Sequence, residues 1–150
     1  MASTSTYLNF QGNTEEVFNF YKSVFGGEFS GGGIARFGDF PAPEGAPSIS
    51  ESDKKLIMHI QLPILGGHIL MGSDAPESLG YKINPGDNVR ILLDPDTREE
   101  TKRLFTALSE GGKITMRNCM TLSGEPITGT LWINMVYNGC LTSPLNNTKA

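Results

Sequence analysis

Apolar and polar residues follow two different periods near the start of the chain. Residues 6–10 read as a short strand, and a helical pattern follows over residues 13–25. We expect Asn13 to cap this helix, with Glu16 completing a capping box, and Gly26-Gly27 to end it. The apolar positions that share one helical face are Val17, Phe20, Tyr21 and Val24. Such a face must be buried, so the helix is expected to pack on a sheet.

The clearest strand pattern covers residues 55–64. Strict alternation along this segment places His59 and Gln61 on the same face of the strand. A turn at Gly66-Gly67 leads into residues 68–74, the expected hairpin partner, in which His68 is expected to be an ordinary surface residue. The preceding segment, 39–55, is rich in proline and polar residues. It predicts a long loop, and loops of this length often serve as lids.

The second half of the chain repeats the order of the first. Residues 88–94 predict a strand, and residues 97–110 predict a helix with a capping box formed by Thr97 and Glu100. The inner face of that helix is expected to consist of Thr101, Leu104, Phe105 and Leu108. Gly111-Gly112 would end it. The chain therefore resembles two copies of a strand, a helix and further strands.

Composition narrows the class of protein. Twelve basic and sixteen acidic residues give a net charge of −4, which argues against a nucleic-acid or anionic-membrane partner. The first ten residues lack the pattern of a signal peptide, and no apolar run is long enough to span a membrane. Cys119 and Cys140 lack the spacing of a zinc site. We therefore expect one cytoplasmic domain spanning residues 1–150.

Two stretches carry a resemblance to a known family. TYLNFQGNTEEVFNFYKSVFGGEF and PEGAPSISESDKKLIMHIQLPI resemble the PhnB-like branch of the vicinal-oxygen-chelate superfamily, which includes glyoxalase I, bleomycin-resistance proteins and extradiol dioxygenases. The resemblance implies an α+β fold of two βαβββ modules, at about residues 6–74 and 87–140. The modules would form an incomplete barrel of mixed sheet around a cavity. It also implies a homodimer.

The resemblance ends close to Arg117. If each following codon is read from its third base, permitted codon choices turn residues 120–129 into DTFWGAYYG and residues 132–140 into DKYGVQWM, which are similar to the family's final strands. Our hypothesis is a frameshift near residues 116–119. The alternative is a tail that has diverged, with a coincidental match. In either case residues 131–137 retain enough alternation to add one strand.

The superfamily's metal ligands are usually His and Glu, one or more from each module. By resemblance, the ligand positions fall at Thr6, at or beside Met71, near Asn88, and in the altered tail. None of the three named residues is His, Glu or Asp. The usual metal set is therefore expected to be absent, and no cofactor is predicted.

The remaining candidates for a ligand cavity are mainly neutral polar residues. His59 is expected to contact a ligand or to act as a general base. The alternative is a half-buried histidine bonded to a neighbouring strand or lying at a subunit contact. Tyr7 is expected to line either the cavity or a dimer contact. The full set of cavity candidates is Tyr7, His59, Gln61, Met71 and Asn88.

Two functions from different classes follow from the resemblance. The first is a metal-free protein that binds a small molecule in the barrel cavity, as bleomycin-resistance proteins do. The alternative is a lyase or dioxygenase-like enzyme that uses a divalent metal. A Rossmann-type methyltransferase is not supported, because Gly31-Gly32-Gly33 is not a strand-to-helix turn followed by an acidic residue.

Overall fold

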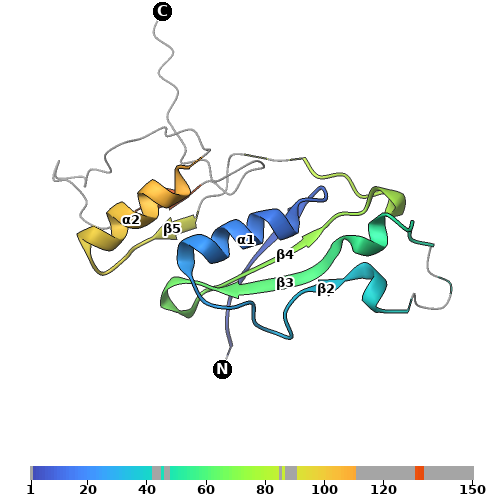
Figure 1. Ribbon diagram of the computed structural model, residues 1–150, viewed down its shortest axis with the longest axis horizontal. Coiled ribbons are helices and arrows are strands. Elements are labelled where there is room, and N and C mark those ends of the chain that lie inside the picture. Colours follow the sequence, from blue (N-terminus) through green and yellow to red (C-terminus); the bar gives the residue numbers. More distant parts are fainter. Residues whose placement is uncertain are drawn as a thin grey trace, which may run out of the picture. The chain divides into compact units, whose positions relative to one another are not determined.

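The computed structural model describes residues 2–41, 45, 48–84, 86 and 91–110, together with the backbone of Leu131–Ile133 (Figure 1). The chain divides into two compact units, Met1–Asn84 and Pro85–Ala150. Within the described residues, no helix is long and apolar enough to cross a membrane.

The first unit is a βαβββ module with an open, mixed sheet. Its elements are β1 (Thr6–Phe10), α1 (Thr14–Phe25), β2 (Ala35–Arg36), β3 (Ile57–Pro63) and β4 (Ile69–Asp74). The spatial order is β1-β4-β3-β2. β1 runs parallel to β4, whereas β3 is antiparallel to both of its neighbours. The predicted α+β class and mixed sheet are confirmed, and this unit contains the predicted order of elements.

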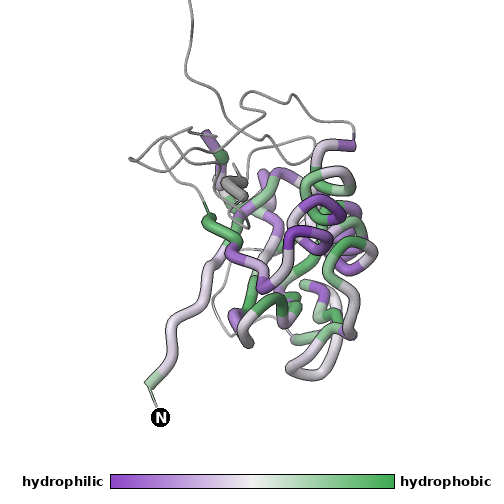
Figure 2. Tube along the Cα trace, turned by 90° about the vertical axis from the view of Figure 1, so that its left-hand side faces the viewer, coloured by the Kyte–Doolittle hydropathy of each residue, from purple (hydrophilic) through white to green (hydrophobic). Residues whose placement is uncertain are grey.

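Helix α1 covers one face of this sheet (Figure 1). Phe18 is fully buried against Gly72 of β4, where an added Cβ would lie only 2.5 Å from the Phe18 ring. The buried side chains of α1 are Thr14, Phe18, Tyr21 and Val24. The predicted inner face was therefore right for Tyr21 and Val24 but rotated at its start, because Phe18 and not Val17 or Phe20 enters the core. Hydrophobic and hydrophilic residues alternate along the helical segments, as expected for amphipathic helices (Figure 2).

The start of α1 is capped by a residue distant in sequence. Asn13 occupies the N-cap position but makes no side-chain cap hydrogen bond, and its Oδ1 is buried without a partner. The predicted capping box of Asn13 and Glu16 is therefore wrong. Instead, the carboxylate of Asp74 accepts the backbone N–H of Thr14 at 3.0 Å. A carboxylate at this position also complements the positive end of the helix dipole.

The second unit contains β5 (Ile91–Leu93), α2 (Arg98–Leu108) and β6 (Leu131–Ile133), with β5 antiparallel to β6. Thr97 caps α2 as predicted, since its hydroxyl accepts the N–H of Glu100 at 3.2 Å. The Glu100 carboxylate does not complete the box and instead binds Arg103. Of the predicted inner face of α2, Leu104 and Leu108 are fully buried.

Several predictions for this half lie on residues that the structure does not describe. They include Asn88, the Gly111-Gly112 stop, Cys119 and Cys140. A strand does form at the start of the segment predicted over residues 131–137. The frameshift hypothesis concerns residues outside the described ranges apart from this short strand, and it stays a prediction.

Candidate functional site

The candidate site is the face of the first sheet that is turned away from α1. Alternate residues of β1, β3 and β4 bury Leu70, Ile60 and Leu62 completely beneath the helix, so their neighbours point to the other side. We call this other side the open face. Its central side chains are Tyr7, Asn9, His59, Gln61, Met71 and Ser73. Four of the five predicted cavity residues are therefore on one surface.

Three of those residues form a single row across the strands. Met71 lies opposite Tyr7 of β1 on one side and opposite Gln61 of β3 on the other. Tyr7 is 46% exposed, whereas Gln61 and Met71 are half-buried. The row therefore offers a phenol, a thioether and a carboxamide side by side.

His59 is brought to this row by its contact with Tyr7. The Tyr7 hydroxyl lies 3.4 Å from His59 Nδ1, and the two ring centroids are 5.9 Å apart at a tilt of 34°. Because β4 lies between β1 and β3, this contact passes over the whole width of β4. When Nδ1 of a neutral imidazole accepts a hydrogen bond from the phenol hydroxyl, the ring hydrogen is on Nε2. His59 is thus bonded to a side chain of β1, two strands away, while remaining on the open face.

Gln61 is positioned by a glycine turn that sequence reasoning passed over. The backbone N–H of Ser30 donates to the Gln61 carbonyl at 3.0 Å, and the carboxamide lies directly over Gly31. A Cβ on Gly31 would fall 1.5 Å from Gln61 Nε2, and Gly31 has a φ of +65°. Only glycine allows both features. The run of three glycines was the available signal, but no local pattern links it to Gln61.

Asn9 and Ser73 form a second polar pair on the open face. The hydroxyl of Ser73 donates to Asn9 Oδ1 at 3.2 Å, next to the row formed by Tyr7 and Met71. Asn9 alternates in step with Tyr7, and Ser73 alternates in step with Met71, whose own place in the candidate set came from the family resemblance. Strand alternation was therefore sufficient to place both residues on this face. No sequence feature specified their pairing.

The structure also places His68, which was expected to be an ordinary surface residue, and Thr6, which falls at one of the family's metal-ligand positions. His68 is not a plain surface residue, because its Nε2 lies 2.9 Å from the Thr6 hydroxyl in a partly buried contact. Thr6 lies opposite the buried Leu70, and so it belongs to the side of the sheet that faces α1. Within the described residues, no three His, Cys, Asp or Glu side chains come together as a metal site would require. Asn88 lies outside those residues, so the metal prediction stays a prediction.

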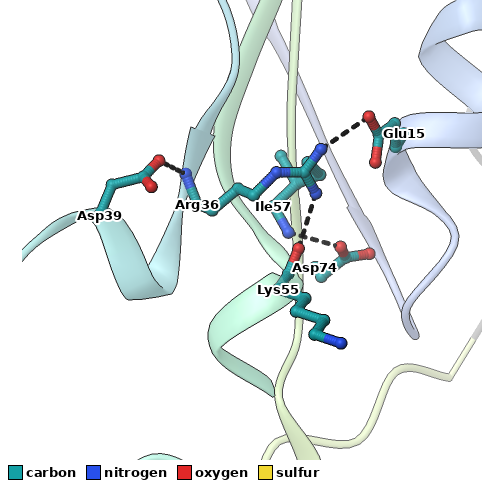
Figure 3. A network of polar contacts seen from close by, with 6 residues as sticks. All are labelled: Glu15, Arg36, Asp39, Lys55, Ile57 and Asp74. Carbon is teal, nitrogen blue, oxygen red and sulfur yellow. Dashed lines mark hydrogen bonds and ion pairs between the residues drawn. The ribbon is translucent and has the colours of Figure 1, made fainter. Parts of the chain in front are cut away.

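Arg36 forms a separate polar network at the edge of the sheet (Figure 3). Its guanidinium binds Glu15 of α1 and the carbonyl of Lys55, each at 2.7 Å, and its own N–H donates to Asp39. The hydrogen bond with Glu15 raises the pKa of Arg36 above its already high ordinary value. The network joins the two ends of the segment that was predicted to be a lid. Parts of that segment lie outside the described residues, and the lid stays a prediction.

Comparisons with known proteins agree with this architecture. No family model matches the chain. Protein YjdN of Escherichia coli is 29% identical over 117 residues, which cover 75% of this chain and 76% of that protein. The crystal structure of protein PA1353 from Pseudomonas aeruginosa superposes on this chain with a TM-score of 0.71 and a sequence identity of 27%. The match covers 97% of this chain and 100% of the PA1353 chain.

A third protein, whose structure is known, has the same fold. The PhnB protein of Bacillus cereus superposes with a TM-score of 0.61 at 22% identity, covering 94% of this chain and 98% of its own. The chain has a PhnB-like fold. The Bacillus protein bears the provisional name 3-demethylubiquinone-9 3-methyltransferase. In the first unit of this chain, Gly31-Gly32-Gly33 leads into strand β2 and not into a helix, so this turn is not the nucleotide-binding turn of a Rossmann fold.

Proposed function

We propose that this chain is a small-molecule binding protein of the PhnB-like branch of the vicinal-oxygen-chelate superfamily. The observation that supports it is the open face, where Tyr7, Met71 and Gln61 form one row and His59 is bonded to Tyr7. These side chains are polar or polarisable, partly accessible, and held by contacts within the sheet. A ligand would therefore meet groups that are already ordered, which lowers the entropic cost of binding.

The geometry favours binding over catalysis. A histidine that acts as general base is commonly oriented by a carboxylate or a similar acceptor on its second nitrogen. The described partner of His59 is the phenol of Tyr7 at 3.4 Å, and the nearest row members are an amide and a thioether. The buried carboxylate of Asp74 is on the side of the sheet that faces α1, and it is occupied by the start of that helix. None of these contacts activates a nucleophile.

We propose that the protein binds its ligand without a metal ion. Elemental analysis of the purified protein tests this. We expect the purified protein to contain much less than one equivalent of Ni, Zn, Mn or Fe. Stoichiometric metal that is lost in His59→Gln would instead favour the alternative, a divalent-metal-dependent lyase or dioxygenase-like enzyme. His68→Gln serves as the comparison, because the other histidine of the chain bonds to Thr6 on the opposite side of the sheet.

The proposal includes a cytoplasmic homodimer with no nucleic-acid or membrane partner. Its support is the family likeness and the acidic net charge of −4, which disfavours binding to nucleic acid and to anionic lipid. Light scattering coupled to size-exclusion chromatography should give twice the chain mass of 16.2 kDa. A monomer at high protein concentration would contradict the dimer but leave binding at the open face untouched.

The binding function itself is tested by a fragment screen with a residue-specific readout. We expect some members of a collection containing neutral, anionic and cationic fragments to shift the imidazole NMR signals of His59 and the side-chain amide signals of Gln61 in a saturable way. The His68 signals should move less, because His68 is on the other side of the sheet. Gln61→Ala should weaken the same compounds. A collection in which no fragment shifts His59 or Gln61 would contradict the proposal.

A further inference from the structure

β1, β3 and β4 contribute no formally charged side chain to the open face. Its six central residues include no Asp, Glu, Lys or Arg. The flanking positions on the same side of β3 and β4 are Pro63 and Ile69, which are also uncharged. The ion pairs of the first unit involve other elements, namely Lys22 with Glu28, Arg36 with Glu15, and Lys54 with Glu51. This part of the sheet is thus polar but neutral.

A neutral polar surface selects ligands by charge. Among the described residues of β1, β3 and β4, an anion that lies on this face would find no fixed cation, and a cation would find no carboxylate. Each ion would lose hydration without a partner of opposite charge on these strands. An uncharged ligand avoids that cost, and it can still exchange hydrogen bonds with the amides of Asn9 and Gln61, which each supply donors and an acceptor.

The same surface favours flat aromatic ligands. Tyr7 and His59 offer two ring faces within 5.9 Å of each other, and Met71 lies opposite Tyr7 in the adjacent strand. Aromatic rings pair with one another in offset or tilted arrangements, and a thioether makes favourable contacts with aromatic edges. A planar ring placed beside this pair would use all three groups.

Resting on the ligand-binding function proposed above, we propose that the open face selects an uncharged aromatic compound bearing a hydrogen-bonding polar group. Ions of the same shape bind less well. Charge, and not shape, is then the main specificity determinant, and the neutral residues Asn9 and Gln61 are the positions that set it. Their amides accept and donate hydrogen bonds without introducing a charge.

Three small probes of nearly identical shape test the proposal. Benzamide, benzoate and benzamidinium differ chiefly in charge, and all three are compared in the same buffer. Titrations followed by the His59 and Gln61 NMR signals should show benzamide binding about tenfold more tightly than either ion. All measurements use the full chain.

Matched variants place a charge on or off the open face. Asn9 and Asn19 are both exposed, but Asn9 is on the open face whereas Asn19 is on the outer side of α1. Asn9→Lys should reverse the preference so that benzoate binds more tightly than benzamide, and Asn19→Lys should leave the native order unchanged. Gln61→Glu should act in the opposite sense and favour benzamidinium, which gives a second test if Asn9→Lys fails to fold.

The possible failures can be told apart. If benzoate or benzamidinium binds the native protein as tightly as benzamide, the charge selectivity is wrong while ligand binding at the open face stands. If all three probes fail while other fragments still shift His59 and Gln61, the aromatic neutral class is wrong. If the whole fragment collection fails to shift these residues, the proposed function is contradicted as well.

Discussion

Asp74, the last residue of β4, accepts hydrogen bonds from both the backbone N–H and the hydroxyl of Thr14, at 3.0 and 2.6 Å. The same carboxylate accepts the N–H of Gly12 at 3.1 Å and, through its other oxygen, the N–H of Ile57 at 2.8 Å (Figure 3). Four donors from the start of α1 and from β3 therefore converge on one buried carboxylate. Such saturation offsets the cost of burying the charge and marks Asp74 as a structural residue.

Asp74→Asn should destabilise the first unit by about 2–3 kcal/mol. Asparagine can still accept hydrogen bonds from Gly12 and Thr14 through its oxygen, but its amide group would meet the N–H of Ile57, and two donors would then face each other. Urea unfolding measures the difference. Glu77→Gln removes an equivalent charge from an exposed side chain and should have little effect. An Asp74→Asn protein as stable as the native one would mean that the cap is dispensable.

Gly31→Ala should disturb Gln61, and Gly32→Ala should not. Both glycines have positive φ, so both substitutions carry a similar backbone cost of about 1 kcal/mol. Only at Gly31 would the new methyl group collide with the Gln61 carboxamide, because nothing lies within 4 Å of a Cβ at Gly32. The side-chain amide signals of Gln61 should therefore move in Gly31→Ala alone, with weaker binding of any fragment that uses this residue. Equal signals in both variants would refute the positioning role.

Thr97→Ala should loosen the first turn of α2 by about 1 kcal/mol, because its hydroxyl accepts the N–H of Glu100. Hydrogen exchange of the α2 amides measures this locally, without relying on global unfolding. Thr106→Ala is the matched control, since Thr106 is an exposed residue within the same helix. Protection that falls equally in the two variants would show that the cap contributes nothing specific.

The frameshift hypothesis predicts a more stable counterpart. A protein whose segment after residue 116 carries DTFWGAYYG and DKYGVQWM should melt at a higher temperature, because each large apolar side chain it buries contributes roughly 1.5–3 kcal/mol. Thermal unfolding of both proteins under the same conditions measures the difference. Equal midpoints together with equal fragment binding would show that the present tail is a genuine part of the fold.

The sequence predicted the features that depend on neighbouring residues. Alternation in β3 placed His59 and Gln61 on one side, and helical spacing located α1 and α2 to within a residue or two. The Thr97 cap was also predictable, because its donor is three residues away. Local periodicity and local caps carry this information by themselves.

The missed features join residues that are far apart in the chain. Asn13 was a plausible cap, but Asp74, 60 residues from Thr14, took the role and left the Asn13 oxygen buried without a partner. The turn at Gly31 and its contact with Gln61 were missed for the same reason. Composition of a single segment cannot show which distant side chain will compete for its hydrogen bonds.

The parallel pairing of β1 with β4 also constrains the order in which the first unit folds. The β3–β4 hairpin closes through a short turn at Leu65–Gly67, whereas Asn9 meets Ser73 only after a loop of 64 residues has closed. Long loops cost more entropy to close and slow the step that needs them. The hairpin therefore has a kinetic advantage, and β1 joins a ladder whose other strand is already in place. We therefore expect the cross-strand neighbours of Tyr7 to be in position before Tyr7 itself arrives.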